Sequence, residues 1–332
     1  MRAVDHPLGL GRALVMTGVA HMLGGQMTQA AAPLEEARRI AARYGLFALE
    51  RGAILNLVTV LLAQSRTAEA LVMLDEGAAL STLFSAKTEE HAFLEARYQC
   101  RVVIGDLGDA FDLRPQLVEL SLAVGEQYRM LSGLLVTTDL PLLIGDAAAA
   151  AVVLAPVQKV MLAEACVDSL VPRAHFALSW LALERGDAAA AEASLAAIGT
   201  TPAHSDEDRV YLAAVRHHCA ALGHRLVLDP VTAAMRGNAS PDNWGCLLAR
   251  SIAAQAASGS VDGATRTAAE SELGNGGMPP LSALQLIDAL IAAGIGDAWH
   301  AEGQRLYIAL GNSLSRHAPE RALFEARFQR LS

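Results

Sequence analysis

The sequence predicts an all-α protein built from repeated antiparallel helix pairs. Hydrophobic residues make up 53% of the chain but aromatic residues only 5%, and most of the apolar content is Ala and Leu, which favour helices. Alternating runs of Val, Ile, Thr and aromatic residues, which are typical of strands, are missing. Glycines also follow apolar helical segments at a nearly constant spacing. A chain of 332 residues exceeds the usual single core, and this spacing favours an elongated repeat over two unrelated domains.

The glycine spacing predicts where the first helix of each pair ends. Glycine adopts the left-handed backbone conformation that stops a helix without strain. Ser65 takes the second place in the series, and successive places are 35 to 41 residues apart. The glycines of the series are Gly25, Gly105, Gly145, Gly186, Gly223, Gly259 and Gly294.

A small residue follows each place of the series after five residues, with Leu228 and Trp299 as exceptions. Alanine there would let the second helix pack closely against the first. These alanines are Ala30, Ala70, Ala110, Ala150, Ala191 and Ala264. The register divides the chain into approximate units 8–46, 47–88, 89–127, 128–168, 169–205, 206–240, 241–278 and 279–312. An amphipathic helix over 317–331 is expected to cover the last apolar face.

The pattern resembles the tetratricopeptide repeat. Matching residues in the first unit are Leu14, Gly18, His21, Gly25, Ala30, Leu34 and Ala37. The second unit keeps Leu57, Leu61, Ala70, Leu74 and Gly77, and the fifth keeps Leu178, Gly186, Asp187, Ala191 and Leu195. Units three, six and eight depart from it at Arg114, Thr232 and Gly303, where a large apolar residue is expected. The resemblance implies one right-handed superhelical solenoid of about eight helix pairs over residues 1–332.

The period near 40 is longer than is usual for that family. It resembles the repeats in the sensor regions of signal-transduction ATPase regulators of the maltose-activator type. Two segments interrupt the pattern. Pro141 is expected to kink or end its helix early, and residues 274–280, rich in Gly and Pro, are expected to form a linker.

Composition excludes several classes of function. The formal net charge of −9, without a basic stripe, disfavours nucleic-acid binding. No phosphate-binding loop, nucleophile elbow or DNA-binding helix-turn-helix is evident. No apolar run approaches the length of a membrane span, and Asp5 and Arg12 argue against a signal peptide. We therefore expect a cytoplasmic, non-catalytic protein without a cofactor, although an enzyme whose residues converge only in space stays open.

The cysteines and histidines do not form a recognisable site. The cysteines, Cys100, Cys166, Cys219 and Cys246, lack metal or disulfide spacing and are expected to be free thiols in a reducing compartment. His217, His218, Cys219 and His224 are the one local cluster of metal-capable residues, but neighbours on a helix point about 100° apart, so no metal site is predicted. His91 and Glu95 are expected to lie on a solvated helix face.

The concave groove of such a solenoid is the expected binding surface. The family's inward positions carry both charges and aromatic rings, which suits capture of a protein or peptide. A small-molecule effector is the alternative ligand. For Phe176 and Trp180 a place in the groove and a place in the core between adjacent units both stay open. The inward residues are Arg12, Leu55, Glu95, Gln99, Asp139, Arg173, Phe176, Trp180, His217 and Asp288.

Overall fold

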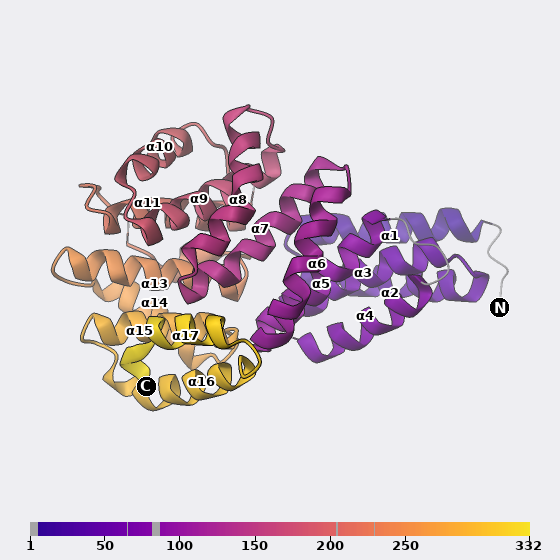
Figure 1. Ribbon diagram of the computed structural model, residues 1–332. Coiled ribbons are helices and arrows are strands. Elements are labelled where there is room, and N and C mark those ends of the chain that lie inside the picture. Colours follow the sequence, from indigo (N-terminus) through magenta and orange to yellow (C-terminus); the bar gives the residue numbers. More distant parts are fainter. Residues whose placement is uncertain (1–5, 65, 82–86, 204, 229) are drawn as a thin grey trace. The chain divides into compact units, whose positions relative to one another are not determined.

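The computed structural model describes residues 6–64, 66–81, 87–203, 205–228 and 230–332. Over these residues it contains seventeen α-helices and three short 3-10 helices, and no strand (Figure 1). The chain separates into two compact units, Met1–Arg101 and Val102–Ser332, and each is described by itself. The prediction of an all-α helical solenoid is confirmed, because successive helices pack on their neighbours along the chain.

The first unit consists of α1 (Pro7–Leu23), α2 (Met27–Tyr44), α3 (Phe47–Ala63), α4 (Thr67–Ser81) and most of α5 (Lys87–Ile104). Its apolar core includes a cluster around Ile54, Leu74 and Phe93, which come from α3, α4 and α5. A methyl group at Gly77 would come within 2.3 Å of the Phe93 ring. Glycine therefore lets α4 and α5 pack closely at this repeat position.

The second unit begins with the last residues of α5 and continues to the C-terminus. Its helices are α6 (Leu107–Ala123), α7 (Gln127–Ile144), α8 (Ala147–Leu162), α9 (Val171–Arg185), α10 (Ala188–Ile198), α11 (Asp206–Ala221), α12 (Ala233–Arg236), α13 (Pro241–Ala257), α14 (Gly263–Gly274), α15 (Pro280–Ala292), α16 (His300–Ser313) and α17 (Ala318–Arg327). The 3-10 helices are η1 (Asp168–Leu170), η2 (Asp297–Trp299) and η3 (Gln329–Leu331). The first helices of the pairs, α7, α9, α11, α13 and α15, pack side by side in this order.

The second unit closes on itself. Helix α6, at its start, contacts α16, near its end. The amide of Leu107 donates a hydrogen bond to Ser313 Oγ at 3.3 Å, and the Arg316 guanidinium lies 2.9 Å from an Asp109 carboxylate oxygen. The unit is therefore held at both ends, whereas an open superhelix would leave its terminal pairs without such a contact.

The glycine register is confirmed. All seven glycines of the series have positive φ, from 64° at Gly186 to 113° at Gly259. Among the alanines, Ala30, Ala70, Ala110, Ala150 and Ala191 are fully buried. Ala264 is exposed, so the close-packing prediction is wrong there, because α14 begins only at Gly263 and Ala264 lies in its first turn. Ser65 lies outside the described residues.

Helix α7 contains Pro141 and continues beyond it to Ile144. The prediction that the helix ends early at this proline is therefore wrong. A proline has no N–H to donate to the carbonyl four residues earlier, which is that of Thr137. That carbonyl instead accepts a hydrogen bond from Arg114 Nε at 3.1 Å. Arg114, a departure from the repeat pattern, thus replaces the backbone donor that Pro141 lacks.

The C-terminal segment covers the apolar face of α15 and α16. Phe324, Phe328 and Leu331 are at most 1% exposed. The Phe324 ring stacks on Tyr307 of α16 with centroids 5.5 Å apart. Before α15, residues 275–279 are not helical, in agreement with the linker predicted over 274–280.

Candidate interaction site

The predicted groove residues divide between the two units. Arg12, Glu95 and Gln99 lie in the first unit, together with Leu55. Arg12 is exposed and the other three are half-buried. His91 is fully buried, with its Nδ1 3.5 Å from Glu95, so the prediction of a solvated face is wrong for His91. The second unit holds the remaining residues, and some of these come together.

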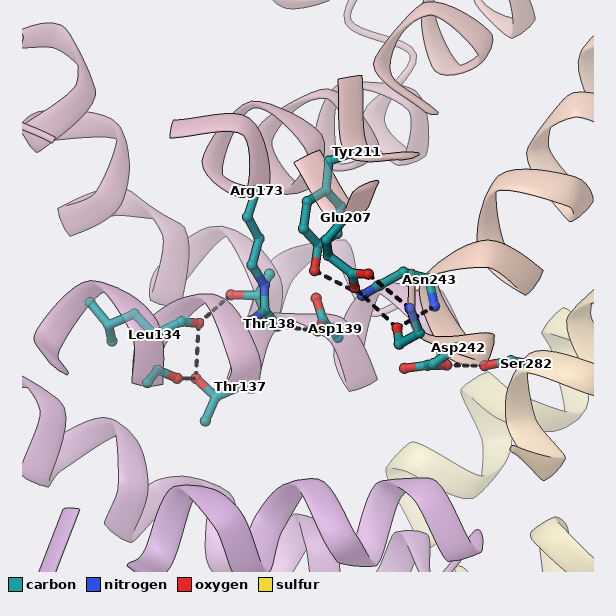
Figure 2. Close-up of polar contacts among 12 residues, drawn as sticks. Leu134, Thr137, Thr138, Asp139, Arg173, Glu207, Tyr211, Asp242, Asn243 and Ser282 are labelled. Atoms are coloured by element: carbon teal, nitrogen blue, oxygen red, sulfur yellow. Dashed lines mark hydrogen bonds and ion pairs between the residues drawn. The ribbon is translucent and has the colours of Figure 1, made fainter. Parts of the chain in front are cut away.

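Asp139 and Arg173 are brought together as an ion pair. Asp139 is on α7 and Arg173 is in the first turn of α9, and their side chains approach to 2.8 Å. Both are half-buried, with side-chain exposures of 29% and 20%. Figure 2 shows this pair beside polar groups from α11, α13 and α15, which point toward one another.

Side-chain hydrogen bonds join α11 to α13 and α13 to α15. Glu207, in the first turn of α11, accepts bonds from the Ser240 amide at 2.8 Å and from Asn243 Nδ2 on α13. Asn243 Nδ2 also donates to Tyr211 Oη at 2.8 Å, and Asp242 accepts a bond from the Ser282 hydroxyl on α15. We call the set that these contacts define the polar row: Asp139, Arg173, Glu207, Tyr211, Asp242, Asn243 and Ser282.

The polar row carries more acidic than basic groups. Its carboxylates are Asp139, Glu207 and Asp242, and its one guanidinium is Arg173. Burial raises the pKa of Asp139 to about 6, although Arg173 opposes the shift, and the charge of Asp242 adds to it. Burial likewise raises the pKa of Asp242, against the hydrogen bond from Ser282. The row therefore presents desolvated carboxylates that its one arginine does not fully compensate.

A second group of charges lies toward the other ends of the same helices. Arg327 of α17 binds Glu184 of α9 through two hydrogen bonds of 2.9 Å. Arg330 of η3 lies 3.4 Å from Asp288 of α15. Helix α17 thus contacts α9, and η3 contacts α15. Helices α9 and α15 therefore both have one side that faces the C-terminal segment. We call this side, with the polar row, the inner face.

Phe176 and Trp180 belong to the core. They are 4% and 2% exposed, so the prediction that they look openly into a groove is wrong, and the alternative of core packing applies. Phe176 contacts Tyr211 of α11 with ring centroids 5.2 Å apart. Trp180 donates from Nε1 to Glu184 at 3.1 Å and carries the Arg250 guanidinium 4.5 Å above its ring. Since α9 packs on both α7 and α11, its aromatic side chains are enclosed between neighbouring pairs.

The histidine and cysteine side chains also serve packing. His217 and His218 are buried, and His218 Nδ1 lies 3.0 Å from Ser179 Oγ. No group of three or more His, Cys, Asp or Glu in the described ranges could hold a metal ion. The four cysteines are free, and three of them are buried. Burial raises the pKa of Cys246 to about 12, which keeps its thiol protonated at neutral pH.

Sequence reasoning found Asp139, Arg173 and Asp288 but missed several residues of the inner face. The missed residues are Glu184, Glu207, Tyr211, Asp242, Asn243, Arg250, Ser282, Arg327 and Arg330. A signal for part of this set was present: Glu207, Asp242 and Ser282 lie in the first turns of their helices, at the place that Arg173 occupies in α9. Comparing that place across units would have found them.

The comparisons with known proteins add no family to these observations. The chain matches no family model and no curated protein.

None of the helices in the described ranges has the length and apolar character needed to cross a membrane. Two surface depressions contain no residue of the polar row in their lining: one includes His224 to Leu228 of the second unit, and the other includes Phe47 and Arg51 of the first.

Proposed function

We propose that this protein is a non-catalytic interaction module that binds a peptide or protein segment on the inner face of its second unit. The observation that carries the proposal is the polar row. Five helices that pack side by side, α7, α9, α11, α13 and α15, contribute half-buried or buried polar side chains to it. Such a surface offers shape and hydrogen-bonding groups to an extended chain.

The repeat pattern supports a finer assignment within this proposal. The glycine and alanine register resembles the tetratricopeptide repeat, a fold whose surfaces serve recognition. The long period resembles the sensor regions of ATPase regulators of the maltose-activator type. On this basis the chain is the sensor or scaffold part of a larger cytoplasmic regulator, and its ligand is a protein.

The experiment is a selection of peptides on the intact protein. A random peptide library is panned on the wild-type chain, and the enriched peptides are measured by fluorescence polarisation. Asp139→Trp places a large ring on the half-buried inner face, and Glu192→Trp places the same ring on the exposed surface of α10. We expect at least about tenfold weaker binding, or about 1.4 kcal/mol, for Asp139→Trp and unchanged binding for Glu192→Trp. Equal affinities for all three proteins would refute the proposal.

A small polar effector is the second candidate. The observation that favours it is the Glu207, Asn243 and Tyr211 network, where a carboxylate, an amide and a hydroxyl meet between two helices. Burial also raises the pKa of Tyr211, so its hydroxyl keeps a proton for hydrogen bonding. Thermal stabilisation by polar amino acids or amines, abolished by Asn243→Leu and accompanied by no peptide enrichment, would favour this candidate over the first.

A further inference from the structure

The polar row, at one end of the inner face, carries more carboxylates than guanidinium groups. Asp139, Glu207 and Asp242 face a single guanidinium, that of Arg173. These carboxylates come from three different helices, so no single helix dipole or local motif explains their association. A ligand that enters here gains most if it brings positive charge and several N–H donors.

Helix α15 supplies an independent observation. Gln285 is 7% exposed, and its Oε1 has no hydrogen-bond partner within the described part of the chain. The same holds for Oδ1 of Asp288. Gln285 lies one helical turn after Ser282 and one turn before Asp288, in the middle of the arc between them. Ser282 contacts Asp242 and Asp288 contacts Arg330, so the arc lies on the inner face, and both unfilled atoms are acceptors.

The chain itself shows which groups satisfy such acceptors. Arg327 approaches Glu184 across 143 positions of sequence and binds it with both terminal nitrogens. Arg330 approaches Asp288 in the same way, with a single contact. Two arginines from one short segment therefore already occupy one end of the inner face, and the carboxylates of the polar row at the other end have one arginine among them.

We infer that the inner face of the second unit binds an extended segment of another protein through its arginine or lysine side chains. This inference rests on the proposed function and names its ligand class. The acidic positions span α7 to α15, and neighbouring helices lie about 8–10 Å apart, so the face extends over up to about 30–40 Å. An extended peptide of about ten residues covers this length, whereas a small diamine or polyamine reaches only part of it.

The test measures binding of a defined probe to the full chain. The probe is a fluorescein-labelled peptide of about twelve residues in which arginines alternate with glycine and serine, and a matched peptide carries glutamine in place of arginine. Asp139→Asn with Asp242→Asn removes two acidic charges from the polar row. Glu119→Gln with Glu192→Gln removes two from exposed sites on α6 and α10, so both double variants have the same net charge. Circular dichroism checks that each variant keeps its helical content.

We expect the arginine peptide to bind the wild type, and the double variant of the polar row to weaken this binding at least about tenfold. The control pair and the glutamine peptide should show little loss and little binding, respectively. Equal weakening by both pairs would reduce the effect to overall charge and overturn the inference. Spermidine that displaces the peptide and binds with the same dependence on Asp139 and Asp242 would assign the face to a small polyamine instead, and would also overturn it.

The outcome separates this inference from the proposed function. If the glutamine peptide or selected acidic peptides bind the inner face, as judged by their sensitivity to Asp139→Trp, while the arginine peptide does not, the cationic ligand class is wrong and the interaction module stands. If no peptide of any composition shows that sensitivity, both are wrong.

Discussion

Replacing Arg114 with methionine should destabilise the second unit through the carbonyl of Thr137. The fully buried Thr137 has a carbonyl oxygen that cannot receive the usual helical bond, because the residue four positions later is Pro141. Arg114 Nε supplies the bond at 3.1 Å. An unsatisfied buried acceptor costs about 1–3 kcal/mol. The second contact of Arg114, 3.3 Å from Nη2 to the Ala149 carbonyl, adds little because that oxygen lies inside α8. We therefore expect a loss of about 1–3 kcal/mol in the free energy of unfolding.

The same substitution in a Pro141→Ala background provides the decisive comparison. Alanine restores the N–H that bonds to Thr137, so Arg114→Met should then cost less by about 1–2 kcal/mol. Urea unfolding followed by tryptophan fluorescence measures all four proteins. The three tryptophans, Trp180, Trp244 and Trp299, lie in the second unit, so the signal reports on that unit. An equal cost of Arg114→Met in both backgrounds would refute the reasoning.

Further predictions concern packing and pH. Phe176→Ala and Trp180→Ala should each lower the free energy of unfolding by about 3–5 kcal/mol, because both rings are buried; unchanged melting temperatures would place the rings outside the core. Ala150→Leu should overpack α8 and cost about 1–3 kcal/mol, whereas Ala155→Leu on the exposed side of α8 should cost little, and equal melting of the two variants would contradict the repeat register. The raised pKa of Asp139, about 6, lies above its unfolded value, so the folded state binds more protons and stability falls as pH rises through about 4 to 6. Asp139→Asn should flatten this fall in urea titrations, and an unchanged pH profile would refute the assignment.

The backbone pattern was predictable because it depends on local chemistry. Gly145 and Gly186 end their helices with positive φ, a conformation that other residues adopt only with strain. Fully buried alanines such as Ala110 and Ala150 follow at the expected interval. Ala264 fails because a longer turn follows Gly259, so α14 begins two positions later than the register predicts, and Ala264 is the second residue of its helix instead of the fourth.

Contacts between distant residues were not predictable in this way. The ion pair of Asp109 with Arg316 joins positions 207 residues apart, and nothing near either residue indicates the other. The Arg114 compensation has the same origin, since a departure from the repeat is explained only by a proline in the next helix. Phe176 and Trp180 were misplaced because a helix between two neighbours buries side chains on both flanks. The register alone does not separate the buried flank from an open one.

The most direct test of the inner face as a binding surface is hydrogen–deuterium exchange of the full chain with and without the arginine peptide. Backbone amides that become covered or rigid exchange more slowly. We predict slower exchange in the first turns of α9, α11, α13 and α15 and around Asp139 in α7, and no such change in the Asp139→Asn, Asp242→Asn variant. Protection confined to α8, α10 and α14, the second helices of their pairs, would contradict the account. Protection that the variant leaves unchanged would contradict it as well.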